Sequence, residues 1–499
     1  MLIFKRFQPQ DVGRESAASD AGKPPISPET VQKRFEGCGD FLSRVVAAGG
    51  TDVGIFVCWM DGTVDAGEVS DQFLRPLSDP KRLGMVRTAA DVRDRLNAGA
   101  VHGCERRVVT DLSDLCEAVS FGNCAAVFEG MAFLFQVKTA QRRNVQEPKI
   151  EKTVKGGKDS FTEVLRVNTG LVRARLRTPE LKLSETVVGR RSRTAVSVLH
   201  LDGIAAPDVP RAVLARLEAL DVDGLVLPDE LDSALSDAPK TMFPQVLHTE
   251  RPDRLAAALL AGHTAVLADG MPLAFVVPSS LPDLFRTAED GAQHFVTASC
   301  LRLLRWGALG LTLLLPALYV AMSMYHAEML PPQLLLSIIA SKQSVPFSTT
   351  AEILGMLLAF ELLQEAGLRL PAPVGQTVSI IGALIVGQSA VEARVISPIA
   401  VIVVALSGIA GYTMPCQDLS AALRLCRFGL TCAGAAAGMF GVVLGTALLL
   451  WRVCSLESFG RAYVPAGREP AGNVFLRRPL WRDTLRNPAL AGENRRRRA

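Results

Sequence analysis

The feature that most constrains this chain is a stretch of 150 residues that almost lacks charge. Residues 306–455 contain 12 charged side chains, six acidic and six basic, whereas the other 349 residues contain 92. A helix needs about 20 apolar residues to cross about 30 Å of hydrocarbon, and this stretch has room for several such helices. The sequence therefore predicts one part that is stable in water and one that is stable in lipid, and it excludes a uniformly water-soluble protein.

Four runs in the charge-poor stretch are long enough to cross a membrane and carry no charge. They are residues 306–325, 370–391, 395–414 and 428–451. The second run contains Gln376 and Gln388, and such polar side chains indicate a helix that faces protein or water rather than lipid all round.

The segment 329–367 is different, because it carries charge. Its first apolar run ends after 13 residues at Lys342, and a helix-like run with three glutamates follows. Carboxylates are costly in lipid, so we expect a segment that is re-entrant, interfacial or part of the lining of a wet cavity. A role in a cation path and a merely interfacial position both remain open. The pore or gating candidates are Glu352, Glu361, Glu365, Gln376 and Gln388.

The last uncharged run contains glycines at spacings of four, three and four residues. This pattern places Gly434, Gly438, Gly441 and Gly445 on one face of a continuous helix. Small residues let helix backbones approach closely in lipid, where no hydrophobic effect drives helices together. We therefore predict a helix-packing face, whose partner helix is in the same chain or in another subunit.

Two patterns recur in the soluble part at nearly the same offset. An apolar run ending in Asp-Gly at residues 53–62 returns at residues 195–203. Two apolar runs around an acidic-Gly pair at residues 125–137 return at residues 265–278, and the two offsets are 141 and 140 residues. Because Gly readily adopts φ > 0, the acidic-Gly pairs predict hairpins. Two matches at one offset predict a tandem duplication of an α/β subdomain.

The predicted fold class is α/β plus α-helical membrane. Two tandem duplicated α/β subdomains precede a polytopic transmembrane helical domain of about four spans and one re-entrant or interfacial segment. An extension rich in proline, serine and charge buries too little apolar area to fold alone. The predicted parts are a disordered amino-terminal extension at 1–34, a first subdomain at 35–146, a helical connector at 147–190, a second subdomain at 191–298, a transmembrane domain at 299–455 and a basic tail at 456–499.

Charge and the amino-terminal sequence predict the side of the membrane that each part occupies. The start of the chain contains no apolar core of a secretory signal, so the soluble part is expected in the cytoplasm. The tail, 456–499, has ten arginines and four acidic residues, which also places it in the cytoplasm. Because both ends of the chain are then on one side of the membrane, the number of crossings must be even. Four spans fit this requirement if the segment 329–367 does not cross the membrane. This count puts Arg424 and Arg427 on the outer side, against the positive-inside rule.

The sequence contains no arrangement of side chains typical of catalysis or metal binding. The ten cysteines form no C-x-x-C pair, and the six histidines are scattered without a useful spacing. Motifs of serine hydrolases, zinc proteases and phosphate-binding loops are also absent from the sequence. The net charge of +4, with no aromatic residues among the basic ones, disfavours nucleic acid as a partner. We predict a protein that is not an enzyme, with no cofactor and no metal.

Several motifs resemble the A-subunit family of spore germinant receptors, the GerA family. The connector resembles that family's E-P-x-x-E, F-T-E and R-x-R stretch, and Thr249–Asp253 and Asp269–Pro272 resemble its T-E-R-P-D and D-G-x-P stretches. Phe360–Tyr412 and Arg424–Phe428 resemble its membrane stretch and its L-R-L-x-R-F motif. The family-motif residues are Glu147, Pro148, Glu151, Phe161, Glu163, Asn168, Arg173, Arg175, Glu250, Arg251, Pro252, Asp253, Asp269 and Gly270.

The resemblance implies a subunit in the inner membrane of a spore, with the amino-terminal domain and the tail in the cytoplasm. It implies two partner proteins, a transporter-like B subunit that receives the nutrient and a lipoprotein C subunit, besides membrane lipid. It further implies a homo-oligomer whose membrane part forms a ligand-gated cation-release channel. Two alternatives from other classes remain, a membrane transporter that works by alternating access and a non-conducting membrane scaffold subunit.

Overall fold

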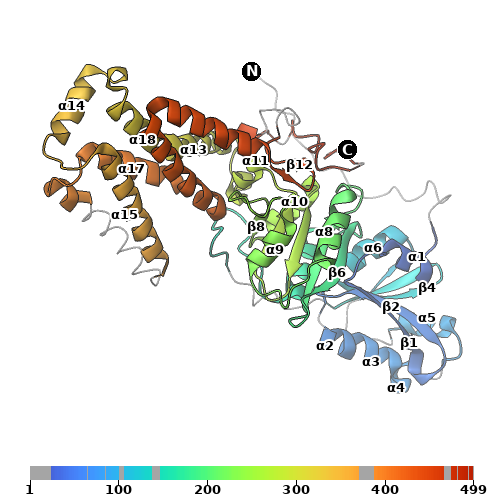
Figure 1. Ribbon diagram of the computed structural model, residues 1–499. Coiled ribbons are helices and arrows are strands. Elements are labelled where there is room, and N and C mark those ends of the chain that lie inside the picture. The colour runs from blue at the N-terminus through green and yellow to red at the C-terminus, as the bar shows by residue number, and fades with distance from the viewer. Residues whose placement is uncertain are drawn as a thin grey trace. The chain divides into compact units, whose positions relative to one another are not determined.

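The protein forms two compact units, each with its own five-stranded sheet (Figure 1). The first unit comprises residues 1–142 with 177–179, and the second comprises residues 143–176 with 180–499. The computed structural model describes residues 24–64, 66–84, 86–99, 106–137, 147–369, 387–465, 474–479, 481–492 and 494–497.

The first unit contains an antiparallel sheet with the strand order β1-β2-β4-β5-β3. β4 and β5 form a predicted hairpin, in which Phe128 pairs with Met131 and Gly130 adopts a φ of 78°. Alternate residues of β2 enter two different apolar cores, one on each face, as the two-residue period of a strand requires. The strands are β1 (Phe41–Ala47), β2 (Gly54–Met60), β3 (Arg106–Val109), β4 (Asn123–Phe128) and β5 (Met131–Gln136).

Helix α1 (Pro28–Arg34) overturns the predicted disorder for the last part of the amino-terminal extension. Ser27 and Thr30 form a reciprocal capping box at its start, and Ile26 and Val31 are fully buried. Capping and burial against the sheet order a segment whose composition alone predicts disorder. The other helical segments of this unit are η1 (Ala48–Gly50), α2 (Ala66–Glu68), η2 (Val69–Leu74), α3 (Arg75–Ser78), α4 (Pro80–Leu83), α5 (Ala89–Asn97) and α6 (Leu112–Ser120).

The sheet of the second unit repeats the strand order of the first, as β6-β7-β9-β10-β8. The second predicted hairpin is β9–β10, with Gly270 at a φ of 80°. The shared order agrees with the duplication predicted from the two offsets. One expectation is wrong, because residues 181–188 of the predicted helical connector form strand β6, whose alternating burial fits a sheet edge. The strands are β6 (Leu181–Val188), β7 (Thr194–Leu201), β8 (Leu247–Thr249), β9 (Thr264–Ala268) and β10 (Ala274–Val277).

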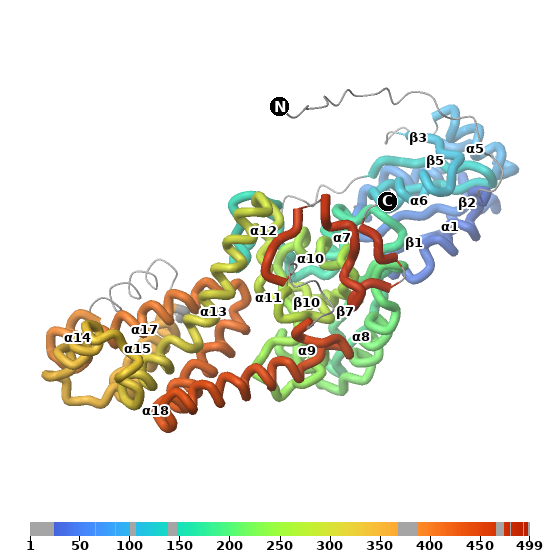
Figure 2. The backbone as a smooth tube through the Cα atoms, turned by 90° about the horizontal axis from the view of Figure 1, so that it is seen from above, coloured from blue at the N-terminus to red at the C-terminus, as the bar shows by residue number. Residues whose placement is uncertain are grey.

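Helices cover both faces of this second sheet (Figure 2). The buried side chains of α7 and α10 belong to one apolar core, and those of α8 and α9 belong to another. We call residues 147–292 the second module. Its helices are α7 (Leu165–Arg175), α8 (Asp208–Glu218), α9 (Pro228–Leu235), α10 (Pro252–Ala261), α11 (Leu281–Leu284) and α12 (Ala288–Ala292).

The apolar helices that follow form the helical part, residues 295–454. Among the described residues, α13 and α18 are long and apolar enough to cross a membrane, whereas α17 is shorter. The predicted four spans are not confirmed, and residues 370–386 of the second predicted span lie outside the described residues. The elements are α13 (Phe295–Met324), η4 (Ala327–Met329), α14 (Pro332–Lys342), α15 (Thr349–Arg369), α17 (Pro398–Gly411) and α18 (Gln417–Cys454).

Helix α18 folds back on itself, which corrects the prediction of one continuous helix at 428–451. The backbone leaves helical geometry at Ala437 (φ −135°) and Gly438 (φ 59°). A Cβ on Gly445 would lie 2.8 Å from Leu430 Cδ2, although fifteen residues of straight helix would separate them by about 22 Å. Glycine adopts the left-handed backbone at little cost, so Gly438 supplies the turn rather than a fourth position on a packing face.

The reversal in α18 brings both of its ends to the second module. Its turn lies at the far end of α13, where the Tyr325 hydroxyl donates to the carbonyl of Ala435 (2.6 Å). Strand β11 (Glu457–Ser458), which pairs with β12 (Arg461–Ala462), follows α18 and lies against the second module. There the side chain of Gln245 donates to the carbonyl of Glu457 (3.0 Å).

The position of Arg424 and Arg427 differs from the predicted outer side. Cys426, between them in sequence, contacts Met242 of the second module, with 3.7 Å between the two sulfur atoms. Both arginines therefore lie on the side of α18 nearest the second module. The four-span count instead places them at the end of the helices away from the soluble part, because it takes 428–451 as one straight helix where the backbone reverses at Gly438.

Candidate functional site

A buried arginine, Arg251, joins the connector to the start of α10. It is 1% exposed, and its Nε and Nη2 donate to the Asp253 carboxylate at 3.0 and 2.6 Å. Nη1 donates to Thr153 Oγ1 (2.8 Å) and to the carbonyl of Glu151 (3.2 Å), and Nη2 also reaches the carbonyl of Gly157 (3.0 Å). The guanidinium thus closes a loop between segments about one hundred residues apart.

The carboxylate of Glu250 organises the same connector. Its Oε1 accepts hydrogen bonds from the backbone N–H groups of Ile150 and Glu151, both at 2.6 Å. The Glu151 carboxylate in turn accepts from Thr249 Oγ1 and from Arg254. Each of these groups gains a hydrogen-bond partner when the connector packs against residues 249–254. The motif residues of this cluster therefore stabilise the fold.

The electrostatics of the cluster agree with this structural role. Burial raises the pKa of the Asp253 carboxyl, but the hydrogen bonds and charge of Arg251 outweigh it and hold the pKa below its ordinary value. The carboxylate is therefore ionised at neutral pH and remains a strong acceptor.

The other family-motif residues lie along the connector and the β9–β10 turn. Asn168, fully buried, accepts from the backbone N–H of Thr162 (2.8 Å), and Asp269 accepts from the N–H of Leu165 (3.0 Å) at the start of α7. Arg175 pairs with Asp159. The carbonyl of Glu163 accepts a hydrogen bond from the N–H of Gly270, and Pro252 is the first residue of α10. Phe161 and Arg173 are buried. Glu147 and Pro148 lie at the start of the connector.

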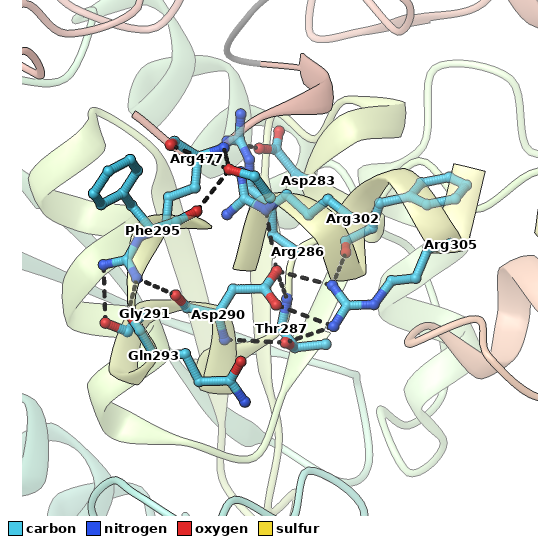
Figure 3. Close-up of polar contacts among 12 residues, drawn as sticks. Asp283, Arg286, Thr287, Asp290, Gly291, Gln293, Phe295, Arg302, Arg305 and Arg477 are labelled. Atoms are coloured by element: carbon cyan, nitrogen blue, oxygen red, sulfur yellow. Dashed lines mark hydrogen bonds and ion pairs between the residues drawn. The ribbon is translucent and has the colours of Figure 1, made fainter. Parts of the chain in front are cut away.

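A second cluster fixes the start of α13 to the second module (Figure 3). Asp290, 2% exposed, accepts from both Nη atoms of Arg305 (2.9 and 3.0 Å) and from Nε of Arg302 (3.2 Å). Burial raises the pKa of Asp290, but the hydrogen bonds from Arg305 outweigh it and hold the pKa below its ordinary value. The two arginines that precede the first predicted span therefore anchor it to α12.

The basic tail also reaches this cluster. Arg477 donates to the carbonyls of Gly291 (2.9 Å) and Gln293 (2.6 Å) at the end of α12 (Figure 3). Phe475 and Trp481 pack on Trp306 and Phe295 of α13, with ring centroids 5.2 and 5.6 Å apart. Sequence analysis missed this contact, because nothing in the spacing of the tail arginines indicates a partner almost two hundred residues earlier.

One histidine, His248, connects the second module to α18. Its Nε2 lies 2.7 Å from Asp232 Oδ1 and its Nδ1 lies 3.2 Å from Asp418 Oδ2. Burial lowers the pKa of His248, but the hydrogen bonds to the two carboxylates outweigh it and raise the pKa to about 9. Both ring nitrogens donate, so the imidazole is charged at neutral pH. The sequence gives no signal for this site, because Asp418 is 170 residues away.

The pore or gating candidates do not come together in the structure. Glu352, 2% exposed, accepts from the N–H (3.0 Å) and hydroxyl (2.8 Å) of Ser397, the residue that caps α17. Lys342 Nζ lies 3.9 Å from the same carboxylate. Glu352 therefore holds α15 against the amino-terminal end of α17, where a helix dipole favours negative charge.

Glu361 lies nine residues, or about two and a half turns, farther along α15 than Glu352. Its carboxylate accepts from Arg424 (3.0 Å) and Arg427 (2.8 Å) of α18. Glu365 is exposed on α15, and Gln388 is exposed and donates to Glu392 (2.9 Å). Gln376 lies outside the described residues.

The candidate packing glycines lie at close approaches of backbone. A Cβ on Gly434 would be 2.9 Å from the carbonyl oxygen of Ala317 in α13, and one on Gly441 would clash with the carbonyl oxygen of Ala433. The first approach joins α18 to α13 and the second joins the two halves of α18. Among the described residues, the partner helices of these glycines are in this chain.

Among the described residues, no three His, Cys, Asp or Glu side chains gather as a metal site. The polar clusters instead join segments of one chain, through Arg251, Asp290, His248 and Glu361. Such clusters can stabilise one conformation of the chain, or transmit a conformational change from one segment to another.

Comparison with known proteins finds relatives over nearly the whole chain. The family described as Bacillus/Clostridium GerA spore germination protein matches residues 29–489. The uncharacterized membrane protein YfkQ of Bacillus subtilis (strain 168) is 34% identical over 474 residues, which cover 93% of this chain and 91% of that protein. Spore germination protein KA of the same strain is 32% identical over 472 residues, which cover 93% of this chain and 86% of that protein.

One solved structure also matches. It is the N-terminal domain of the A subunit of the Bacillus megaterium spore germinant receptor GerK3. The match has a TM-score of 0.40 and 22% sequence identity, and it covers 52% of this chain and 98% of that domain.

Proposed function

Because this chain belongs to the GerA family of spore germination proteins, we propose that it is the A subunit of a nutrient-sensing germinant receptor that triggers germination. The observation that carries the proposal is the extent of the family match, from residue 29 to residue 489. That range includes both sheets and the helical part. Such a subunit is not an enzyme.

The proposed location is the spore inner membrane, with both sheets and the tail in the cytoplasm. α13 and α18 supply candidate spans. Arg302 and Arg305 at the start of α13 and Arg477 of the tail meet at one cluster, so these cations share one side of the helical part. The positive-inside rule favours the cytoplasm for that side.

The proposed partners are the B and C subunits that accompany A subunits in germinant receptors. The B subunit, similar to transporters, receives the nutrient, and the C subunit is a lipoprotein. A nutrient signal then biases a two-state assembly in which this chain is the effector.

We further propose that copies of this chain form a ligand-gated cation-release channel. Glu365 is the first pore candidate, because its side chain is exposed on α15 whereas that of Glu352 is buried. Gln388 is a second exposed candidate. An exposed carboxylate on a helix of the membrane part favours cations along a water-filled path.

The test is nutrient-triggered potassium release from spores that carry Glu365→Gln. We expect slower release than from wild-type spores, because the substitution removes the negative charge and keeps the shape. Glu328→Gln, in the exposed turn η4, is the matched control and should leave release unchanged. Normal release from the Glu365→Gln spores at a normal protein level would reject the pore role.

The alternative functions are a membrane transporter and a non-conducting membrane scaffold subunit. Secondary transporters usually contain inverted repeats of many spans, and among the described residues two helices meet the length and apolarity of a span. Self-association after detergent extraction separates a channel from a monomeric transporter. A channel is separated from a scaffold by variants Glu365→Gln and Gln388→Leu. In a channel these variants keep the B subunit bound and slow the ion flux, whereas in a scaffold the flux stays normal as long as the B subunit is bound.

A further inference from the structure

A small pocket lies between α15, α17 and α18, close to the second module. Its polar lining comprises Glu361 and Gln364 of α15 and Ser420, Arg424 and Arg427 of α18. The cavity volume is about 20 Å³, which admits one small group and not a whole nutrient molecule. Any occupant is therefore an ion or the end of a larger molecule.

The lining of this pocket carries more positive than negative charge. Both oxygens of Glu361 are already used, because Oε1 accepts from Arg427 Nη2 (2.8 Å) and Oε2 accepts from Arg424 Nη1 (3.0 Å). One carboxylate thus faces two guanidinium groups, and the lining has a formal net charge of +1. A cation gains nothing from such a site, and an anion completes it.

Two of the lining side chains also have donors left over. A guanidinium has five N–H donors. Arg427, 3% exposed, donates to Glu361 and to Ser407 (3.3 Å), and its buried Nε–H has no acceptor among the described residues. The Nε–H of Arg424 is likewise buried and unpaired. Buried donors in proteins are nearly always satisfied, so these two call for an acceptor that the described residues do not supply.

We propose that this pocket binds the oxygen end of a singly charged oxyanion group, a carboxylate or the phosphodiester of an anionic lipid. Planar guanidinium groups form short, charge-assisted hydrogen bonds with such oxygens. Tyr412 and Gln364, two residues with neutral donor groups, also line this pocket. Glu361 is then a positioning residue that orients two arginines. This inference goes beyond the channel proposal and does not depend on it.

The experiment measures the thermal stability of the purified full chain with and without the probe anion. In detergent, sodium acetate is titrated against sodium chloride at equal ionic strength. In nanodiscs, phosphatidylcholine alone is compared with phosphatidylcholine plus phosphatidylglycerol. We expect a rise in Tm of about 2 °C or more with acetate, with phosphatidylglycerol, or with both. A rise with acetate assigns the site to soluble carboxylates, and a rise only with phosphatidylglycerol assigns it to lipid.

Two variants and one control decide whether this pocket is responsible. Arg424→Gln removes the excess charge, and Gln364→Phe fills the pocket while every charge stays. Both should lose the anion-dependent rise. Arg452→Gln changes an exposed arginine in the last turn of the same helix and should keep it. Equal shifts with acetate and chloride, no shift with either probe, or a full response in both pocket variants would overturn the proposal.

Discussion

Two buried arginines, one in the second module and one in the helical part, use their donors in opposite ways. Arg251 donates from all three nitrogens of its guanidinium to carboxylate, hydroxyl and carbonyl oxygens of its own chain. Arg427 is buried to a similar degree, yet its Nε–H has no acceptor in the part of the chain that the structure describes, and it shares one carboxylate with Arg424. Burial alone therefore does not distinguish a structural arginine from a binding one. The difference lies in the donors that folding leaves unfilled.

The largest loss of stability is expected at Arg251, whose three guanidinium nitrogens all donate hydrogen bonds. Arg251→Met should lower the free energy of unfolding by about 3–5 kcal/mol, because it leaves the Asp253 carboxylate and two carbonyl oxygens buried without their donor. Thermal and chemical unfolding of the full chain in detergent measures this loss. A loss below about 1 kcal/mol would show that the connector cluster does not hold the second module together.

A smaller loss is expected where helices approach most closely. Gly434→Ala should cost about 1–3 kcal/mol, since the new Cβ would lie 2.9 Å from the Ala317 carbonyl and 3.1 Å from Val442 Cγ2. Gly429→Ala in the same helix meets nothing within 4 Å and should be neutral or slightly stabilising. Equal Tm values for the two variants would contradict the packing role of Gly434.

The link between the second module and α18 should depend on pH. The folded state raises the pKa of His248 from 6.5 to about 9, so its contribution is complete below pH 6.5 and is lost as the pH rises through 9. We expect about 2 kcal/mol at pH 6, because the side chain is largely buried between two carboxylates.

His248→Gln isolates this contribution. The stability difference between wild type and variant should be largest near pH 6 and should shrink above pH 9. The pH dependence of groups that do not contact the imidazole is common to both proteins and cancels in the difference. A difference that stays constant from pH 6 to pH 10 would show that the imidazole acts by packing and not by charge.

The smallest effect is expected at an exposed ion pair. Arg190 and Asp221 are 67% and 66% exposed, so Arg190→Gln should change the free energy of unfolding by less than about 0.5 kcal/mol. This variant calibrates the scale of the other three. If Arg190→Gln lowered the free energy of unfolding as much as Arg251→Met does, a buried and fully hydrogen-bonded arginine would contribute no more to stability than an exposed one.

Local chemistry made the hairpins of both sheets predictable from the sequence. The apolar runs around Glu129-Gly130 and Asp269-Gly270 specify β4–β5 and β9–β10, because turn residues and alternation act over a few positions. Edge strand β6 was missed, since its pattern is half polar and lies in a segment with strong helix signals. A strand at the edge depends on a neighbour that the local sequence does not reveal.

The course of the membrane part was less predictable. Glycines at spacings of four and three fit a straight packing face and also a tight turn between two antiparallel helices. The structure uses Gly438 for the turn and Gly434 and Gly441 for close packing. The error about the side of Arg424 and Arg427 followed from this one ambiguity. Contacts such as His248 with Asp418 arise only after the chain has folded, so no spacing rule reaches them.

The central claim is that this chain is a germinant receptor subunit, and nutrient-triggered potassium release from spores tests it most directly. The chain and its partner subunits are expressed in spores from which every other GerA-family receptor has been deleted. The account predicts release in response to at least one nutrient of a broad panel, and loss of that release when only this chain is removed. Release that is identical with and without the chain would contradict it.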